Sequence, residues 1–150
     1  MTRINLVDPE DLTDVHLVAE YKELTQFLHL VRKRVDNKHP MDDIPEEYCL
    51  NGGHCKFFYD KGKYLYRRYI HIRNNLVDRN KNINDEKFRN NLRRIRESYS
   101  KELFNDYQPT PAAFKIATDR ILERINQKPH LYKDKNRFIR SLSKYRKIGR

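Results

Sequence analysis

Residues 13–37 read TDVHLVAEYKELTQFLHLVRKRVDN, and this stretch decides the fold. Its apolar side chains recur at alternating steps of four and three residues, at Leu17, Tyr21, Leu24, Leu28, Val31 and Val35. That spacing places them on one stripe of a long helix. Asp11 or Thr13 can cap the start of the helix, and His39-Pro40 closes it. We therefore expect a long amphipathic helix near the N-terminus.

Three later segments also favour helices. A helix over residues 60–78 would carry Leu65, Tyr69, Ile72 and Leu76 on one face, and a shorter, highly charged helix would follow the break at residues 82–85. Thr110 as N-cap and Pro111 at the first helical position predict the start of a third helix, which ends near Lys128. The side chains of this helix that would face the core are Ala113, Ala117, Ile121 and Ile125. Strand-like alternation is scarce. The sequence predicts an all-α, compact single domain of about three main helices with long loops.

The chain has 150 residues and a formal net charge of +11 at pH 7, which favours a polyanionic partner such as nucleic acid. Eight of its Lys and Arg residues fall within residues 131–150, beside a single acid, Asp134. We expect a helical domain over residues 1–133 and a basic C-terminal tail over residues 134–150. The tail would act mainly by attracting phosphate. The alternative is that it packs on the core through Tyr132, Phe138 and Tyr145.

Several classes of protein are disfavoured. Cys49 and Cys55 are too few for a disulfide framework, and no motif with metal-ligand spacing supports a metal site around them. No apolar run reaches the ~18–20 residues that a membrane span needs, and the N-terminus lacks the apolar core of a signal peptide. We expect an intracellular, DNA-associated monomer that needs no metal or other cofactor and does not bind membranes.

The candidate chemistry lies at the N-terminus and on the first helix. Removal of Met1 would expose the α-amine of Thr2, whose pKa of about 8 leaves roughly a tenth of it neutral and nucleophilic at pH 7. His16, Glu20 and Glu23 share one flank of the helix, beside its apolar stripe. Taken singly, a glutamate or histidine on a helix is more often an ordinary solvated side chain. An amine near a carboxylate on a basic chain is suited to attack a sugar carbon in DNA.

The sequence resembles the viral and phage pyrimidine-dimer DNA glycosylases, the family of phage endonuclease V. The similarity is carried by separated matches over most of the chain: Thr2-Arg3-Ile4-Asn5-Leu6, His16-Leu17, Ala19-Glu20-Tyr21, Glu23-Leu24, Gly53-His54, Phe57-Phe58-Tyr59-Asp60-Lys61, Asp106-Tyr107 with Pro109, and Pro129 with Tyr132-Lys133. The family has Arg at the positions of Lys22 and Gln26, and a C-terminal aromatic cluster that is mostly absent here.

The resemblance implies a DNA repair enzyme that acts on cyclobutane pyrimidine dimers in UV-damaged duplex DNA, as an N-glycosylase and an abasic-site lyase. The α-amine of Thr2 would attack C1′ and form an imine (Schiff base), and Glu23 would stabilise the cationic sugar and assist β-elimination. It also implies DNA contacts, including non-specific contacts to duplex DNA, at Arg3, His16, Lys22, Lys33, Arg120 and Arg124. One alternative is a non-catalytic basic helical protein that binds DNA or RNA. Another alternative, a metal-dependent nuclease, would need clustered carboxylates, and Glu20 and Glu23 with Asp11 or Asp14 are poor candidates for such a cluster.

Overall fold

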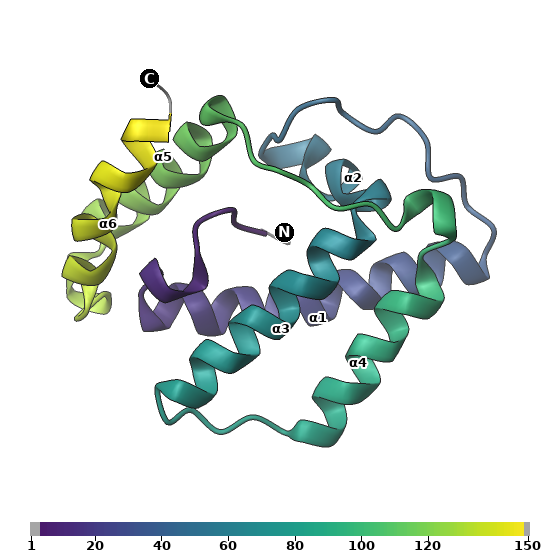
Figure 1. Ribbon diagram of the computed structural model, residues 1–150, viewed down its shortest axis with the longest axis horizontal. Helices are drawn as coiled ribbons and strands as arrows, with labels where there is room; N and C mark the ends of the chain where they lie inside the picture. The colour runs from purple at the N-terminus through teal and green to yellow at the C-terminus, as the bar shows by residue number, and fades with distance from the viewer. Residues whose placement is uncertain (1–3, 149–150) are drawn as a thin grey trace.

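The computed structural model describes residues 4–148, and Figure 1 shows how helices dominate this part of the chain. Its α-helices are α1 (Asp14–Asp36), α2 (His54–Phe57), α3 (Gly62–Asp78), α4 (Asp85–Ser98), α5 (Pro111–Gln127) and α6 (Lys135–Ile148). Short 3-10 helices join them at η1 (Pro9–Asp11), η2 (Asn51–Gly53), η3 (Phe58–Asp60), η4 (Lys101–Leu103) and η5 (Pro129–Leu131). Residues 4–148 contain no β-strand beyond an isolated bridge between Lys61 and Phe104, which confirms the all-α prediction.

The predicted count of about three main helices is too low, because five helices of 14 or more residues form in the described chain. The two helices beyond that count both have a face to bury. α4 covers the core with Phe88 and Ile95, and α6 covers it with Phe138 and Leu142. A helix of this length is stabilised mostly by such packing and only weakly by intrinsic propensity.

The start of α1 is fixed by Thr13, whose hydroxyl oxygen accepts the backbone N–H of His16 at 3.1 Å. Leu17, Leu24, Leu28 and Val31 are buried as the periodicity predicts. Val35 is instead exposed in the last turn of the helix. Phe27 and Glu20 were outside the predicted stripe, and both are buried.

Three helices, α1, α3 and α4, pack on one another pairwise and enclose the main core. Tyr69 of α3 is fully buried between the other two. Its ring stacks on Tyr21 of α1 at 5.0 Å and on Phe88 of α4 at 5.3 Å between centroids. Its hydroxyl accepts a hydrogen bond from Asn91 Nδ2 at 3.0 Å, so the polar end of the buried ring is satisfied.

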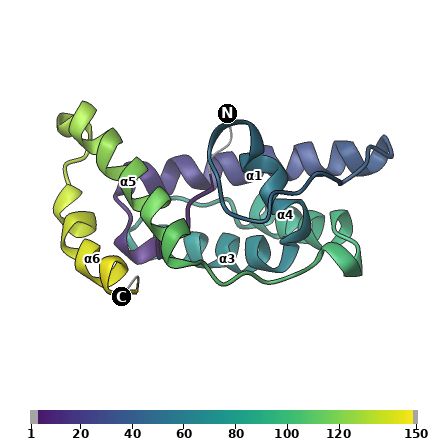
Figure 2. The ribbon, with the colours of Figure 1, turned by 90° about the horizontal axis from the view of Figure 1, so that it is seen from above.

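The helices α5 and α6 pack against each other and form a pair at one end of the molecule, as Figure 2 shows. Thr110 caps α5 and Pro111 is its first residue, as predicted, and the four predicted inward side chains of α5 are buried. Residues 135–148 form α6, and Tyr132, Phe138 and Tyr145 are buried. The C-terminal segment therefore packs on the core through these three aromatic side chains, which was the alternative to a tail that acts mainly by attracting phosphate.

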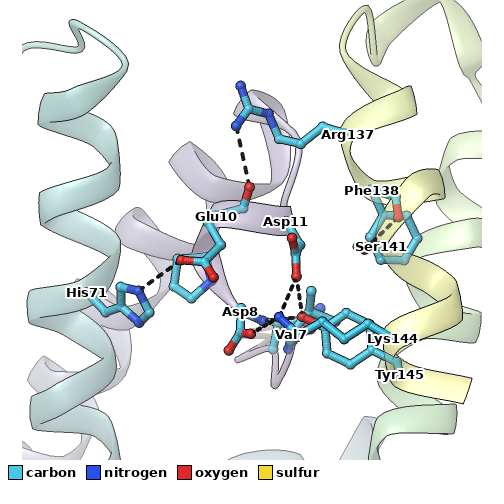
Figure 3. A network of polar contacts seen from close by, with 12 residues as sticks. Val7, Asp8, Glu10, Asp11, His71, Arg137, Phe138, Ser141, Lys144 and Tyr145 are labelled. Atoms are coloured by element: carbon cyan, nitrogen blue, oxygen red, sulfur yellow. Dashed lines mark hydrogen bonds and ion pairs between the residues drawn. The ribbon is translucent and has the colours of Figure 1, made fainter. Parts of the chain in front are cut away.

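Figure 3 shows how α6 holds the segment before α1. The Tyr145 hydroxyl accepts the backbone N–H of Asp8 at 2.9 Å and donates to Asp11 Oδ2 at 2.6 Å. Lys144 forms ion pairs with both carboxylates, Asp8 and Asp11. From the other side, Arg79 at the end of α3 donates to the carbonyl of Pro9 at 3.0 Å. The last helix and the N-terminal segment thus fold against each other.

We expect Phe138→Ala to lower the free energy of unfolding by about 3–5 kcal/mol, because it removes a fully buried ring from the α5–α6 contact. Ile139→Ala is the matched control, since Ile139 is its neighbour on α6 and is 41% exposed. Urea unfolding followed by circular dichroism measures both. Equal losses for the two variants would contradict the packed role of α6.

Candidate active site

A pocket of about 400 Å³ lies between α1, α5, the N-terminal segment and the loop before α2. Side chains that are far apart in sequence meet in its wall: Ile4, Asn5, His16, Glu20, Glu23, Tyr48, Arg120, Arg124 and Tyr132. His16 and Glu23 were predicted as site residues from the start of α1, and Arg120 and Arg124 from α5. The structure brings these four together, and it places the residues that follow the N-terminus beside them.

The backbone of Ile4 is held from both sides. Its N–H donates to Nε2 of His54 at 2.6 Å, and its carbonyl accepts the hydroxyl of Tyr48 at 2.9 Å. Nδ1 of His54 lies 2.9 Å from the carbonyl oxygen of Cys49. Because Nε2 accepts a hydrogen bond, the ring proton sits on Nδ1 and is donated to that carbonyl. A neutral, buried His54 therefore fixes the chain two residues after Thr2.

The sequence around His54 explains how that ring is placed. A Cβ on Gly53 would lie 2.8 Å from Cys49 Sγ and 3.2 Å from Pro45 Cγ, so only glycine lets the preceding loop close over the start of α2. Phe57 and Phe58 are fully buried and meet each other edge to face, with ring centroids 5.0 Å apart. The segment from Gly53 to Lys61 thus serves as the support for His54.

Glu20 lines the same pocket as Glu23, yet its charge is neutralised within the protein. Both Glu20 and Arg68 are buried, and Arg68 donates to the two carboxylate oxygens at 2.5 Å and 2.9 Å. Burial by itself lowers the pKa of Arg68, but the carboxylate of Glu20 outweighs it and raises this pKa above its usual value. Sequence reasoning missed this pair. The available signal was an arginine three residues after Leu65, inside the apolar stripe of α3.

His16 is a half-buried ring between α1 and the segment after α5. It stacks on Tyr132 with centroids 4.7 Å apart, and its Nδ1 lies 2.8 Å from the Thr13 hydroxyl. Burial lowers the pKa of His16 to about 4; Asp134 opposes the shift and Arg124 adds to it. The ring is neutral at pH 7. Its Nε2 is buried and has no hydrogen-bond partner within residues 4–148.

The remaining predicted site residues lie elsewhere. Lys22 lines a second pocket on another flank of α1, and Lys33 is exposed near the end of that helix. Thr2 and Arg3 lie outside the described residues. Among residues 4–148, no three His, Cys, Asp or Glu side chains are grouped closely enough to hold a metal ion, and none of the helices there is long and apolar enough to cross a membrane.

A comparison with known protein families adds an independent finding. A family model described as pyrimidine dimer DNA glycosylase matches residues 1–89. The matched part contains the N-terminal segment, α1 with Glu23, the loop and α2 with His54, and α3 with Arg68. The matched residues therefore include all the pocket-lining residues from Ile4 to Leu50, and those on α5 and after it lie outside the match.

The lowered pKa of His16 predicts a pH-dependent stability. Below about 6.5 the unfolded chain takes up a proton on this ring, whereas the folded protein does so only near pH 4. Stability is therefore lost as the pH falls from about 6.5 to about 4. We expect His16→Gln to lose less free energy of unfolding over that range than the wild type, in urea unfolding at several pH values.

His130→Gln is the control for that experiment, because His130 is exposed. The wild type and this control should lose stability in parallel. If His16→Gln follows the same curve as both of them, the ring is not desolvated in the folded protein.

Proposed function

The chain belongs to the pyrimidine dimer DNA glycosylase family, and from this premise we propose that it excises cyclobutane pyrimidine dimers from duplex DNA and then cuts the strand through an imine intermediate. The observation that carries the proposal is a single pocket lined by Glu23 of α1, by the anchored Ile4, and by Arg120 and Arg124 of α5. This arrangement supplies a carboxylate, cations for phosphate, and a fixed residue two positions after Thr2 in the sequence.

We assign the nucleophile to the α-amine of Thr2, after removal of Met1. Two residues of chain extend at most about 7 Å from the fixed Ile4, which keeps the amine within reach of the pocket. The neutral amine attacks C1′ of the damaged nucleotide, the glycosidic bond breaks, and the base leaves with the bonding electrons. Loss of a proton from nitrogen gives an aminal; the C1′–O4′ bond then breaks, O4′ takes up a proton, and the ring-opened sugar is left as the imine.

We assign to Glu23 the stabilisation of the cationic sugar and the acceptance of the 2′ proton. Glu20 is engaged by Arg68, so this second carboxylate of the pocket is already neutralised. Removal of the 2′ proton expels the 3′ phosphate by β-elimination, and water then hydrolyses the imine and returns the free amine. These steps call on the terminal amine, one carboxylate and water.

Cations of α5, of α1 and of the N-terminal segment would hold the DNA around the site of the reaction. Arg120 and Arg124 are one turn apart on α5 and face the same pocket, as contacts to successive phosphates require. Lys22 and Lys33, together with Arg3, would extend the contact along the duplex. The unpartnered Nε2 of His16 supports a hydrogen bond from this ring to the bound nucleotide.

Borohydride reduction should crosslink the protein to dimer-containing duplex DNA through the α-amine of Thr2, because reduction makes the imine permanent. An extra residue before Thr2 should abolish crosslinking while leaving the fold unchanged. Peptide mapping of the crosslink identifies the amine. A crosslink to a lysine would overturn the assignment to Thr2, and no crosslink together with intact DNA binding would favour a non-catalytic DNA-binding protein.

Glu23→Gln should retain lesion binding and lose nearly all strand cleavage, because the amide keeps the shape of the side chain without its charge or basicity. Glu102→Gln, at an exposed position of η4, is the matched control and should cleave like the wild type. Single-turnover cleavage of dimer-containing DNA measures both. Cleavage by Glu23→Gln near the wild-type rate would remove the role that we give this carboxylate.

A further inference from the structure

Exposed polar and basic side chains follow one face of α1, on the side away from the core. Lys22, Gln26, His29 and Lys33 recur at steps of four, three and four residues, and all four are exposed. Ala19, three residues before Lys22, lines the active-site pocket, whereas Lys22 and Gln26 line a second pocket of about 510 Å³. The face of α1 that carries these four side chains thus forms a ridge that borders the active-site pocket and the second pocket.

The far side of the second pocket is formed by α4 and the turn before it. Lys87 of α4 lines this pocket together with Lys22, Gln26 and Asn91. One flank of α4 also reaches α1 further along, where Arg94 Nη1 lies 2.6 Å from His29 Nδ1. Lys87 and Arg94 are seven residues apart and share this flank. Figure 1 shows α4 approaching α1.

The flank of α4 that faces α1 carries the cations Lys87 and Arg94, and its carboxylate of Glu97 pairs with Arg32 of α1 at 3.9 Å. The second pocket is lined by Lys22, Lys81 and Lys87 with uncharged side chains, and no carboxylate is among its lining residues. Within residues 4–148, no salt bridge links Lys22, Lys87 or Arg94 to an acidic side chain. Burial lowers the pKa of His29, and Arg94 and Lys87 lower it further. The two α4 cations therefore add to the positive potential at the face of α1.

We propose that Lys87 and Arg94 of α4 extend the DNA-binding surface across α1, where they bind phosphates of the duplex outside the active-site pocket. Seven residues of helix span about 10 Å, so the two side chains can each contact a different phosphate of the duplex. A duplex laid on the ridge of α1 would meet α5 cations on one side and α4 cations on the other. The proposal rests on the proposed function for the identity of the partner, duplex DNA.

The test is the salt dependence of binding to undamaged duplex DNA by the full-length protein. Each phosphate contact contributes about 0.9 to the slope of log K against log salt, so the double variant Lys87→Gln/Arg94→Gln should lower the slope by about 1.8. Between 50 and 200 mM salt, the wild type should then lose about 12-fold more affinity than this variant. Fluorescence anisotropy of a labelled duplex measures both slopes.

Arg89→Gln/Arg93→Gln is the matched control, because it removes two exposed cations from the same helix on the side away from the second pocket. The control should keep nearly the wild-type slope. Equal slopes for the two double variants would overturn the proposal, because the effect would then be one of net charge. Thermal unfolding checks both variants, and if the first does not fold, Lys87→Gln alone should lower the slope by about 0.9.

This experiment is separate from the test of the chemistry. A lowered slope together with failed borohydride crosslinking would keep the α4 surface and overturn the proposed reaction. Successful crosslinking together with an unchanged slope would keep the reaction and overturn the α4 surface.

Discussion

The anchored peptide of Ile4 is the constraint on which the rest of the structure depends. A buried backbone N–H and carbonyl must both find partners, and here the partners are the side chains of His54 in α2 and Tyr48 in the loop before it. Those two side chains stand where they do because Gly53 lets the loop close and because Phe57 and Phe58 fill the space beneath them. The position of Ile4 is therefore set by residues about fifty positions away in the sequence.

The other end of the same segment is held by α6 and α3. Tyr145 and Lys144 fix Asp8 and Asp11, and Arg79 fixes Pro9, so residues 4–12 are tied down along their length. A helix rich in Lys and Arg can thus position the segment that leads into the candidate site, in addition to any direct attraction of DNA. In the mechanism that we propose, a fixed N-terminal segment limits the positions open to the terminal amine, which a free chain end would spread widely.

The sequence predicted those features that are encoded locally. The stripe of α1, its cap at Thr13 and the start of α5 at Pro111 follow from residues within a turn or two of each other. The ion pair of Glu20 and Arg68 could not be predicted in the same way, because a glutamate on the flank of a helix has the same pattern whether it faces solvent or a buried arginine. The packing of α6 depended likewise on distant partners, Asp8 and Asp11, which no local pattern reveals.

The distribution of charge in the pocket follows from these distant pairings. Glu20 and Glu23 are three residues apart on α1, and two unbalanced carboxylates there would repel both each other and an approaching phosphate. Arg68 neutralises the deeper one, while burial keeps His16 neutral at pH 7. The arginines that line the pocket are on α5, at Arg120, which pairs with Glu123, and Arg124, whereas the carboxylate of Glu23 comes from α1. In the proposed reaction, a DNA backbone bound at these arginines therefore lies in the same pocket as Glu23, whose carboxylate would meet the positive charge that develops on the sugar.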